Sequence, residues 1–380
     1  MTLESRSTIR TRLVPILLLA TLAIAGWLVI GGLLFRSGLY YRYLASPDST
    51  AGEAERALLV IQKRYRPGAR NVLVLGDSRT NEGFSSKLAN HAVPGINFIE
   101  AGMAGTTPRV WYYLLRKVDP DGDRFAAIVL VQICDATFPN REDLSERPLD
   151  LAYLPPLLTL EDGFDLPASF HDAALRKQAW RTVLLPIRAA RSDLAELAAT
   201  PHMRFRQVRA NLRAYADSRY DYAGHPESLA AVRLDPSTLH PVATTASPAG
   251  LVDYLDRLEA SRTSSMPTRP ENQAYYRYWI SRIAGAGHRT PRRVFVATLP
   301  RGPFHQQFGP PPRPSLQAIG LSTGDGVALL APPEVAALER PEYFFDGLHM
   351  DSAGRNRYSV ILAQSVAAAL RAPTVGGDAP

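Results

Sequence analysis

Three residue types that cooperate in nucleophilic catalysis occur at two places far apart in the sequence. Ser78 ends a Gly-Asp-Ser tripeptide that directly follows the apolar run 71–75. Asp346 and His349 stand at the two ends of an Asp-Gly-Leu-His segment near the C-terminus. A serine hydroxyl attacks a carbonyl carbon when a histidine removes its proton and a carboxylate orients that histidine. We therefore predict Ser78 as the nucleophile, His349 as the base and Asp346 as the orienting acid.

A loop of small residues is a candidate for stabilising the negative charge that such an attack produces. It runs from Ala101 to Thr107, after the apolar run 96–99. Small residues allow backbone N–H groups to approach a ligand closely, so we expect the N–H groups of Gly105 and Ser78 to hold an oxyanion. Each of these motifs alone is also typical of an ordinary turn or helix cap. Their shared position at strand ends or beside the last helix favours a catalytic site.

Alternating strands and helices are predicted on both sides of these residues. The expected strands are the mostly apolar runs at 71–75, 96–99, 126–133, 293–299 and 326–330. The expected helices between and after them cover 107–118, 272–284 and 352–370. Continuous apolar strands separated by helices are typical of a parallel sheet that is covered on both faces. Such sheets bind ligands at the carboxyl ends of their strands, which is where Ser78 stands.

Residues 138–270 interrupt this alternation and are interpreted as a helical insertion. They are rich in proline, leucine and arginine, with helical stretches around 172–200 and 203–218. Residues 171–220 contain ten Arg or Lys and only four Asp or Glu. This excess favours a solvated helical face, and contact with lipid headgroups or an acidic polymer is the alternative.

The N-terminus carries a run of 23 uncharged residues, 13–35, which is long enough to cross the hydrocarbon core of a bilayer. We predict an uncleaved anchor with everything after it outside the cytoplasm, and a cleaved signal peptide is the competing interpretation. The predicted organisation is a cytoplasmic N-terminus at 1–12, a transmembrane anchor at 13–35, a connector at 36–70, a domain at 71–372 and a disordered tail at 373–380.

Composition excludes several classes of site. Cys134 is the only cysteine of the 380 residues, so an intrachain disulfide framework or a multi-cysteine metal site cannot form. The eight histidines show no metal-ligand spacing, and no metal or cofactor is expected. The net charge of +7 is spread over a long chain, which is weak support for a nucleic-acid partner, and none is expected.

The order of these motifs resembles the SGNH superfamily, also called GDSL esterases and lipases. The resemblance covers residues 71–136 and about 290–370 and leaves out the insertion. It implies that Ser78 is the nucleophile, Gly105 the glycine of the second block, and Asp346 with His349 the acid and base of the last block. It also implies a flavodoxin-like three-layer α/β/α sandwich around a five-stranded parallel sheet.

One position departs from the family pattern. The third block usually supplies an oxyanion-hole asparagine soon after the third strand, and no asparagine stands there in this chain. Asp135 is the closest polar candidate and Asn140 a looser one. Arg79, directly after the nucleophile, could steer an anionic or polyhydroxylated substrate, or it could pair with an acid such as Glu82 or Glu100.

The resemblance implies a serine esterase or O-acyltransferase. Membrane-tethered bacterial relatives with a similar layout often act on acetyl groups of envelope or exported polysaccharides. We therefore expect a single-pass protein of the inner membrane with a periplasmic domain that takes carbohydrate or acyl-ester substrates. A catalytically weak polysaccharide-binding module of a membrane complex is the alternative from another functional class. A lipase that acts at the membrane surface is a third possibility.

Overall fold

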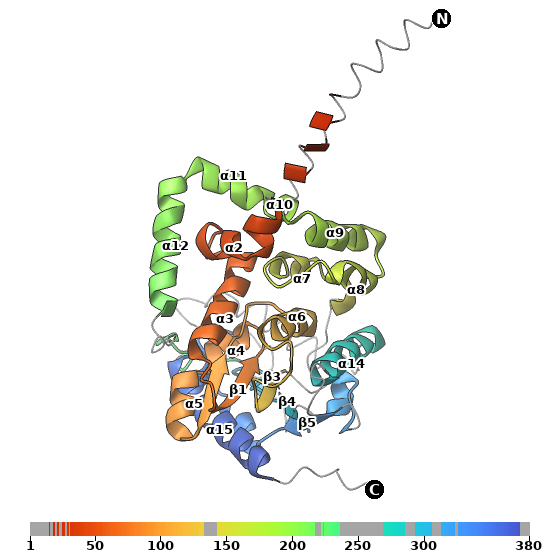
Figure 1. Cartoon of the computed structure of the whole chain (residues 1–380). Helices are drawn as coiled ribbons and strands as arrows, with labels where there is room; N and C mark the ends of the chain where they lie inside the picture. Colours follow the sequence, from red (N-terminus) through yellow and green to blue (C-terminus); the bar gives the residue numbers. More distant parts are fainter. Residues whose placement is uncertain are drawn as a thin grey trace, which may run out of the picture. The chain divides into compact units, whose positions relative to one another are not determined.

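The computed structural model describes residues 31–132, 143–216, 222, 224–235, 269–285, 293–305, 313–323 and 326–372, together with isolated positions between 15 and 29. The chain divides into two compact units (Figure 1). The first comprises Met1–Glu55 and Leu154–Asn211, and the second comprises Arg56–Tyr153 and Leu212–Pro380. The described part of the predicted insertion is therefore shared between the two units.

The second unit contains a five-stranded sheet in which every neighbouring pair is parallel. The strands follow the order β2-β1-β3-β4-β5 and are β1 (Arg70–Leu75), β2 (Ile96–Glu100), β3 (Ala127–Val131), β4 (Arg293–Ala297) and β5 (Val327–Leu330). The predicted α/β class and five-stranded parallel sheet are thus confirmed. The strand order changes direction between β1 and β3, so a crevice at the carboxyl end of β1 is the expected ligand site.

Helices cover the strands because the strands are apolar on both faces. Val72 and Val74 of β1 lie in a core cluster with Tyr358 and Leu362 of α15. The alternate residue Leu73 points to the opposite face of the sheet and is also fully buried. This arrangement is consistent with a three-layer sandwich. The α-helices that lie wholly within the described part of this unit are α4 (Ser78–Gly83), α5 (Ser86–Ala92), α6 (Pro108–Val118), α7 (Pro148–Tyr153), α14 (Pro270–Gly285) and α15 (Ser352–Arg371).

The first unit is helical in its described part. Its small core contains the aromatic rings of Phe35, Tyr40 and Tyr41, packed with Ala190. Tyr40 also donates a hydrogen bond to the carboxylate of Asp193. The unit contains the π-helix η1 (Gly31–Arg36), α2 (Leu39–Tyr43), α8 (Asp162–Ala168), α9 (Ala173–Leu184), α10 (Pro186–Ala189), α11 (Arg191–Ala199) and the larger part of α12 (Pro201–Ala216). The predicted connector at 36–70 folds into α2, the helix α3 (Thr50–Arg64) and the first residue of β1.

No helix within the described residues combines the length and the apolar composition that a membrane crossing requires. The predicted span at 13–35 is described at only some of its positions, and 1–12 and 373–380 lie outside the described residues. At its described end, Phe35 is buried against Tyr40 and Tyr41. The membrane anchor therefore stays a prediction.

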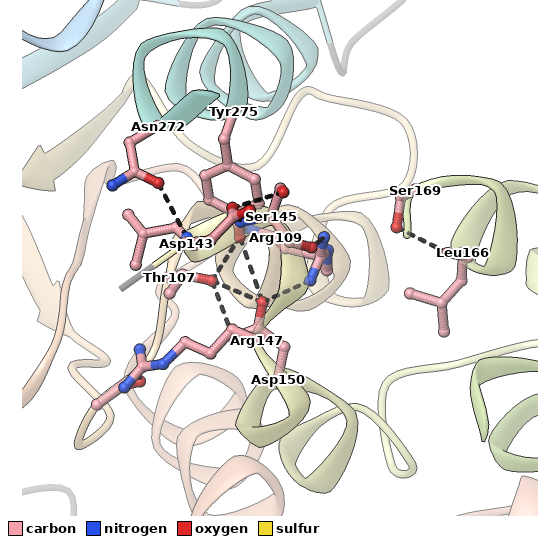
Figure 2. A network of polar contacts seen from close by, with 12 residues as sticks. Thr107, Arg109, Asp143, Ser145, Arg147, Asp150, Leu166, Ser169, Asn272 and Tyr275 are labelled. Carbon is pink, nitrogen blue, oxygen red and sulfur yellow. Dashed lines mark hydrogen bonds and ion pairs between the residues drawn. The ribbon is translucent and has the colours of Figure 1, made fainter. Parts of the chain in front are cut away.

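A buried polar network fastens the segment 143–153 to helices α6 and α14 (Figure 2). Arg109 and Asp150 are fully buried and form an ion pair of 3.0 Å between Nη1 and Oδ2. Thr107 Oγ1 donates to the same carboxylate at 2.9 Å, and Tyr275 Oη lies 2.7 Å from Thr107 Oγ1. The side chain of Asp150 thus joins its own helix, α7, to both neighbours.

Asp150→Ala is expected to lower the free energy of unfolding by about 3–5 kcal/mol, because it leaves the Arg109 guanidinium buried without its carboxylate. Replacing both charges together, as Arg109→Met with Asp150→Leu, should recover most of this loss. Chemical denaturation of the three proteins measures the effect. An Asp150→Ala protein as stable as the wild type would contradict the prediction.

Candidate functional site

The tripeptide that ends in Ser78 forms a sharp turn between β1 and α4. Asp77 caps α4, since its Oδ1 accepts the Arg79 N–H at 3.0 Å. A Cβ on Gly76 would stand 1.9 Å from Thr80 Oγ1, so any larger residue at this position requires Thr80 to shift. Ser78 is the first residue of α4 and is partly exposed at the carboxyl end of β1. The turn therefore presents the serine at the predicted crevice.

The fold brings together the three residues that the sequence singled out for nucleophilic catalysis. His349 Nε2 lies 2.9 Å from Ser78 Oγ, although the two residues are 271 positions apart. His349 Nδ1 lies 2.8 Å from Asp346 Oδ2. All three residues are partly exposed. Serine, histidine and aspartate thus form one continuous chain of hydrogen bonds that is open to a ligand.

Asp346 is held rigidly by its own turn. Its Oδ1 accepts the backbone N–H groups of Leu348 and His349, each at 2.7 Å, while Oδ2 meets the imidazole. Burial by itself raises the pKa of Asp346, but the hydrogen bond and charge of His349 and these two N–H groups outweigh it and lower the pKa. An ionised Asp346 favours the tautomer with a proton on Nδ1, so Nε2 is free to accept a proton from Ser78.

The segment 224–235 braces the loop that carries His349. Its Leu229 N–H donates to Phe344 O at 2.7 Å, and the carbonyl of His225 accepts the Ser352 N–H at 2.7 Å. The His225 ring packs on Phe345 at a centroid distance of 3.8 Å. Sequence reasoning assigned this segment to the insertion and missed its role, since no local motif marks it.

The ring of Phe345 is stacked on the His349 imidazole at a centroid distance of 5.8 Å and an interplanar angle of 16°. A pair of this kind contributes about 0.5–1.5 kcal/mol. Phe345→Ala is therefore expected to lower kcat/KM for ester hydrolysis by roughly two- to tenfold, because His349 gains freedom. Phe164→Ala in the first unit, where the ring is 80 % exposed, is the matched control and should have no effect. Equal rates for both variants would show that the stack does not matter.

The Arg79 guanidinium forms an ion pair with Asp77, two positions earlier in the sequence. Its Nη2 lies 2.6 Å and its Nε 3.1 Å from Asp77 Oδ2. The structure therefore pairs Arg79 with Asp77, where the sequence suggested Glu82 or Glu100. The guanidinium still lies beside the nucleophile and retains some exposure.

The loop that contains Gly105 is fastened to the nucleophile turn. The Met103 N–H donates to Gly76 O at 3.0 Å, and Thr106 Oγ1 lies 3.3 Å from the same oxygen. Gly105 has φ = +62°, a conformation that favours glycine. Within the described residues, the N–H groups of Gly105 and Ser78 donate to no protein acceptor. Both are therefore available to an oxyanion.

The other predicted positions add little. Asp135, Asn140 and Cys134 lie outside the described residues, so the third-block position stays a prediction. Among the residues that the structure does describe, no group of three or more His, Cys, Asp or Glu is placed to hold a metal ion.

The comparisons with known proteins identify no family for this chain. No protein-family model matches the chain, and no curated protein matches its sequence. The resemblance to SGNH hydrolases therefore depends on the motifs and on the placement of Ser78, His349 and Asp346.

Proposed function

We propose that this protein is an SGNH-type serine hydrolase or acyltransferase that acts on acyl esters. The observation that carries the proposal is the hydrogen-bonded chain from Ser78 Oγ through His349 to Asp346, at 2.9 and 2.8 Å. A serine, histidine and aspartate in this order are the groups that acyl transfer requires.

The reaction proceeds in two halves. Ser78 Oγ attacks the ester carbonyl carbon while its proton passes to His349 Nε2, and the N–H groups of Gly105 and Ser78 stabilise the oxyanion. The ester C–O bond then breaks, the alcohol leaves with the proton from His349, and an acyl-Ser78 remains. Water or a sugar hydroxyl next gives its proton to His349 and attacks the acyl carbon. The bond between that carbon and Ser78 Oγ then breaks, and Oγ takes the proton back from His349. This releases a free acid in the first case and a new ester in the second.

For substrate and location we propose acetyl esters of envelope or exported carbohydrate, outside the cytoplasm. The support is the resemblance to membrane-tethered SGNH proteins together with the apolar run 13–35, which we propose as a single-pass anchor in the inner membrane. The anchor would keep the catalytic unit at the membrane, close to surface polymers. We further propose that this unit is the flavodoxin-like sandwich of that family, in line with its strand order.

A fluorophosphonate probe tests the proposed chemistry on the full-length protein in detergent. It phosphonylates a serine that a histidine activates, and peptide mapping by mass spectrometry locates the adduct. We expect one adduct, on Ser78, and faster turnover of acetyl than of long-chain esters. Carbohydrate binding without any adduct would overturn the enzyme proposal in favour of a binding module. A preference for long-chain esters would instead indicate a lipase.

A further inference from the structure

Two side chains from the segment 143–153 hold the backbone on both sides of Gly105. Tyr153 Oη donates to Ala104 O at 2.5 Å, and Arg147 Nη1 donates to Gly105 O at 2.6 Å. These carbonyls belong to the two peptide groups that flank the Gly105 α-carbon. The two hydrogen bonds therefore restrict rotation of both peptide planes, the one before and the one after the Gly105 α-carbon.

The first of these hydrogen bonds sets the direction of the Gly105 N–H. The peptide between Ala104 and Gly105 is trans, so its N–H points opposite to its C=O. With Ala104 O held by Tyr153, the Gly105 N–H must point away from Tyr153. A glycine at φ = +62° has many other conformations open to it, and such a donor stabilises an oxyanion only when it is already oriented.

The holding residues are themselves anchored in the core. Tyr153 follows Asp150 on α7, and the buried ion pair of Asp150 with Arg109 fixes that helix. On the other side of Arg147, Ser145 O accepts Arg109 Nη2 at 2.7 Å. Arg109 therefore binds the chain both before and after Arg147 (Figure 2). The buried network and the Gly105 loop thus form one connected support.

We propose that Tyr153 and Arg147 are positioning residues for the oxyanion hole, and that they keep the Gly105 N–H in its productive direction. The inference depends on the proposed function, since it assigns a task within that reaction. It also gives the buried network a purpose.

Tyr153→Phe is the sharpest test, because it keeps the ring and removes one hydrogen bond. We expect kcat and the rate of Ser78 phosphonylation to fall roughly tenfold, a part of the 10²–10³ lost when a donor is deleted. KM should change little. Tyr40→Phe is the matched control, since it removes a hydroxyl bonded to Asp193 in the first unit. Arg147→Met should also lower kcat and the rate of Ser78 phosphonylation. Arg147→Lys should be faster than Arg147→Met and slower than the wild type.

Amide hydrogen exchange keeps the inference separate from the proposed function. The positioning role predicts faster exchange of the peptide that covers residues 101–107 in Tyr153→Phe and in Arg147→Met, and unchanged exchange in Tyr40→Phe. Faster exchange together with wild-type kcat would overturn the inference while the hydrolase proposal stands. Unchanged exchange in both variants would overturn it whatever the activity. An unlabelled wild-type Ser78 would overturn the hydrolase proposal and with it any positioning role in catalysis.

Discussion

Ser78→Ala and His349→Ala are each expected to lower kcat for ester hydrolysis by roughly 10⁴–10⁶-fold, with little change in KM. Without Ser78 there is no oxygen to form the acyl-enzyme. Without His349, whose Nε2 lies 2.9 Å from that oxygen, the hydroxyl keeps its proton and remains a poor nucleophile. Because the two residues act as one unit, the double variant should be no slower than either single variant.

The measurement is steady-state hydrolysis of an acetyl ester by the full-length protein, with circular dichroism to confirm folding. Ser365→Ala on α15 is the matched control, because it removes a partly buried hydroxyl that bonds only to Ile361 O of its own helix among the described residues. It should retain the wild-type rate. If Ser78→Ala hydrolysed the ester as fast as Ser365→Ala, Ser78 would not be the nucleophile.

The elements that local sequence patterns determine were predictable. Each strand of the sheet is a mostly apolar run, and the buried faces of β1 and β3 explain why. The last helix, predicted at 352–370, spans Ser352–Arg371 and needs a capping residue at its start. The structure selects Asp351, whose Oδ1 accepts the Gly354 N–H at 2.8 Å.

The residues around the site were not predictable, because contacts distant in the sequence determine their roles. Arg109 stands in the first turn of α6, and arginine at such a position is usually exposed to solvent. Its burial depends on Asp150, 41 positions later, which supplies a carboxylate, and on Ser145, which supplies a carbonyl oxygen. Likewise, Arg147 carries no motif, and its contact with Gly105 requires that the segment 143–153 fold back on the glycine loop. Pairing of this kind depends on tertiary structure that no local pattern records.

The predicted catalytic residues could be found from the sequence, but the contacts that support them could not. Asp346 and His349 were found because their offset of three residues fits a tight turn, and the turn supplies the two N–H groups that hold Asp346 Oδ1. Their partner Ser78 was found through its place at a strand end. The supporting segment 224–235 could not be predicted from the sequence. Its His225 packs on Phe345 although the two residues are more than a hundred positions apart.

Asp346→Asn separates the roles of charge and tautomer, and is expected to lower kcat about 10⁴-fold with the fold intact. An asparagine oxygen can keep the two backbone N–H groups that Oδ1 accepts. Its NH₂ group then faces His349 Nδ1 in place of Oδ2, which forces Nδ1 to accept and moves the imidazole proton to Nε2. A protonated Nε2 cannot take a proton from Ser78. Steady-state kinetics measures the loss, and wild-type kcat in this variant would remove Asp346 from the catalytic chain.

The same pair of proteins makes the charge of Asp346 visible in stability. Because the folded protein lowers the pKa of Asp346, its carboxylate stabilises the fold at every pH above the unfolded value of about 3.9. That contribution is lost as the pH falls through the folded pKa. Urea unfolding of wild type and Asp346→Asn should therefore give a difference in unfolding free energy that shrinks as the pH falls below about 4. A difference that grew on acidification would mean that Asp346 is held in its neutral form, and a neutral acid could not stabilise the imidazolium that forms on His349.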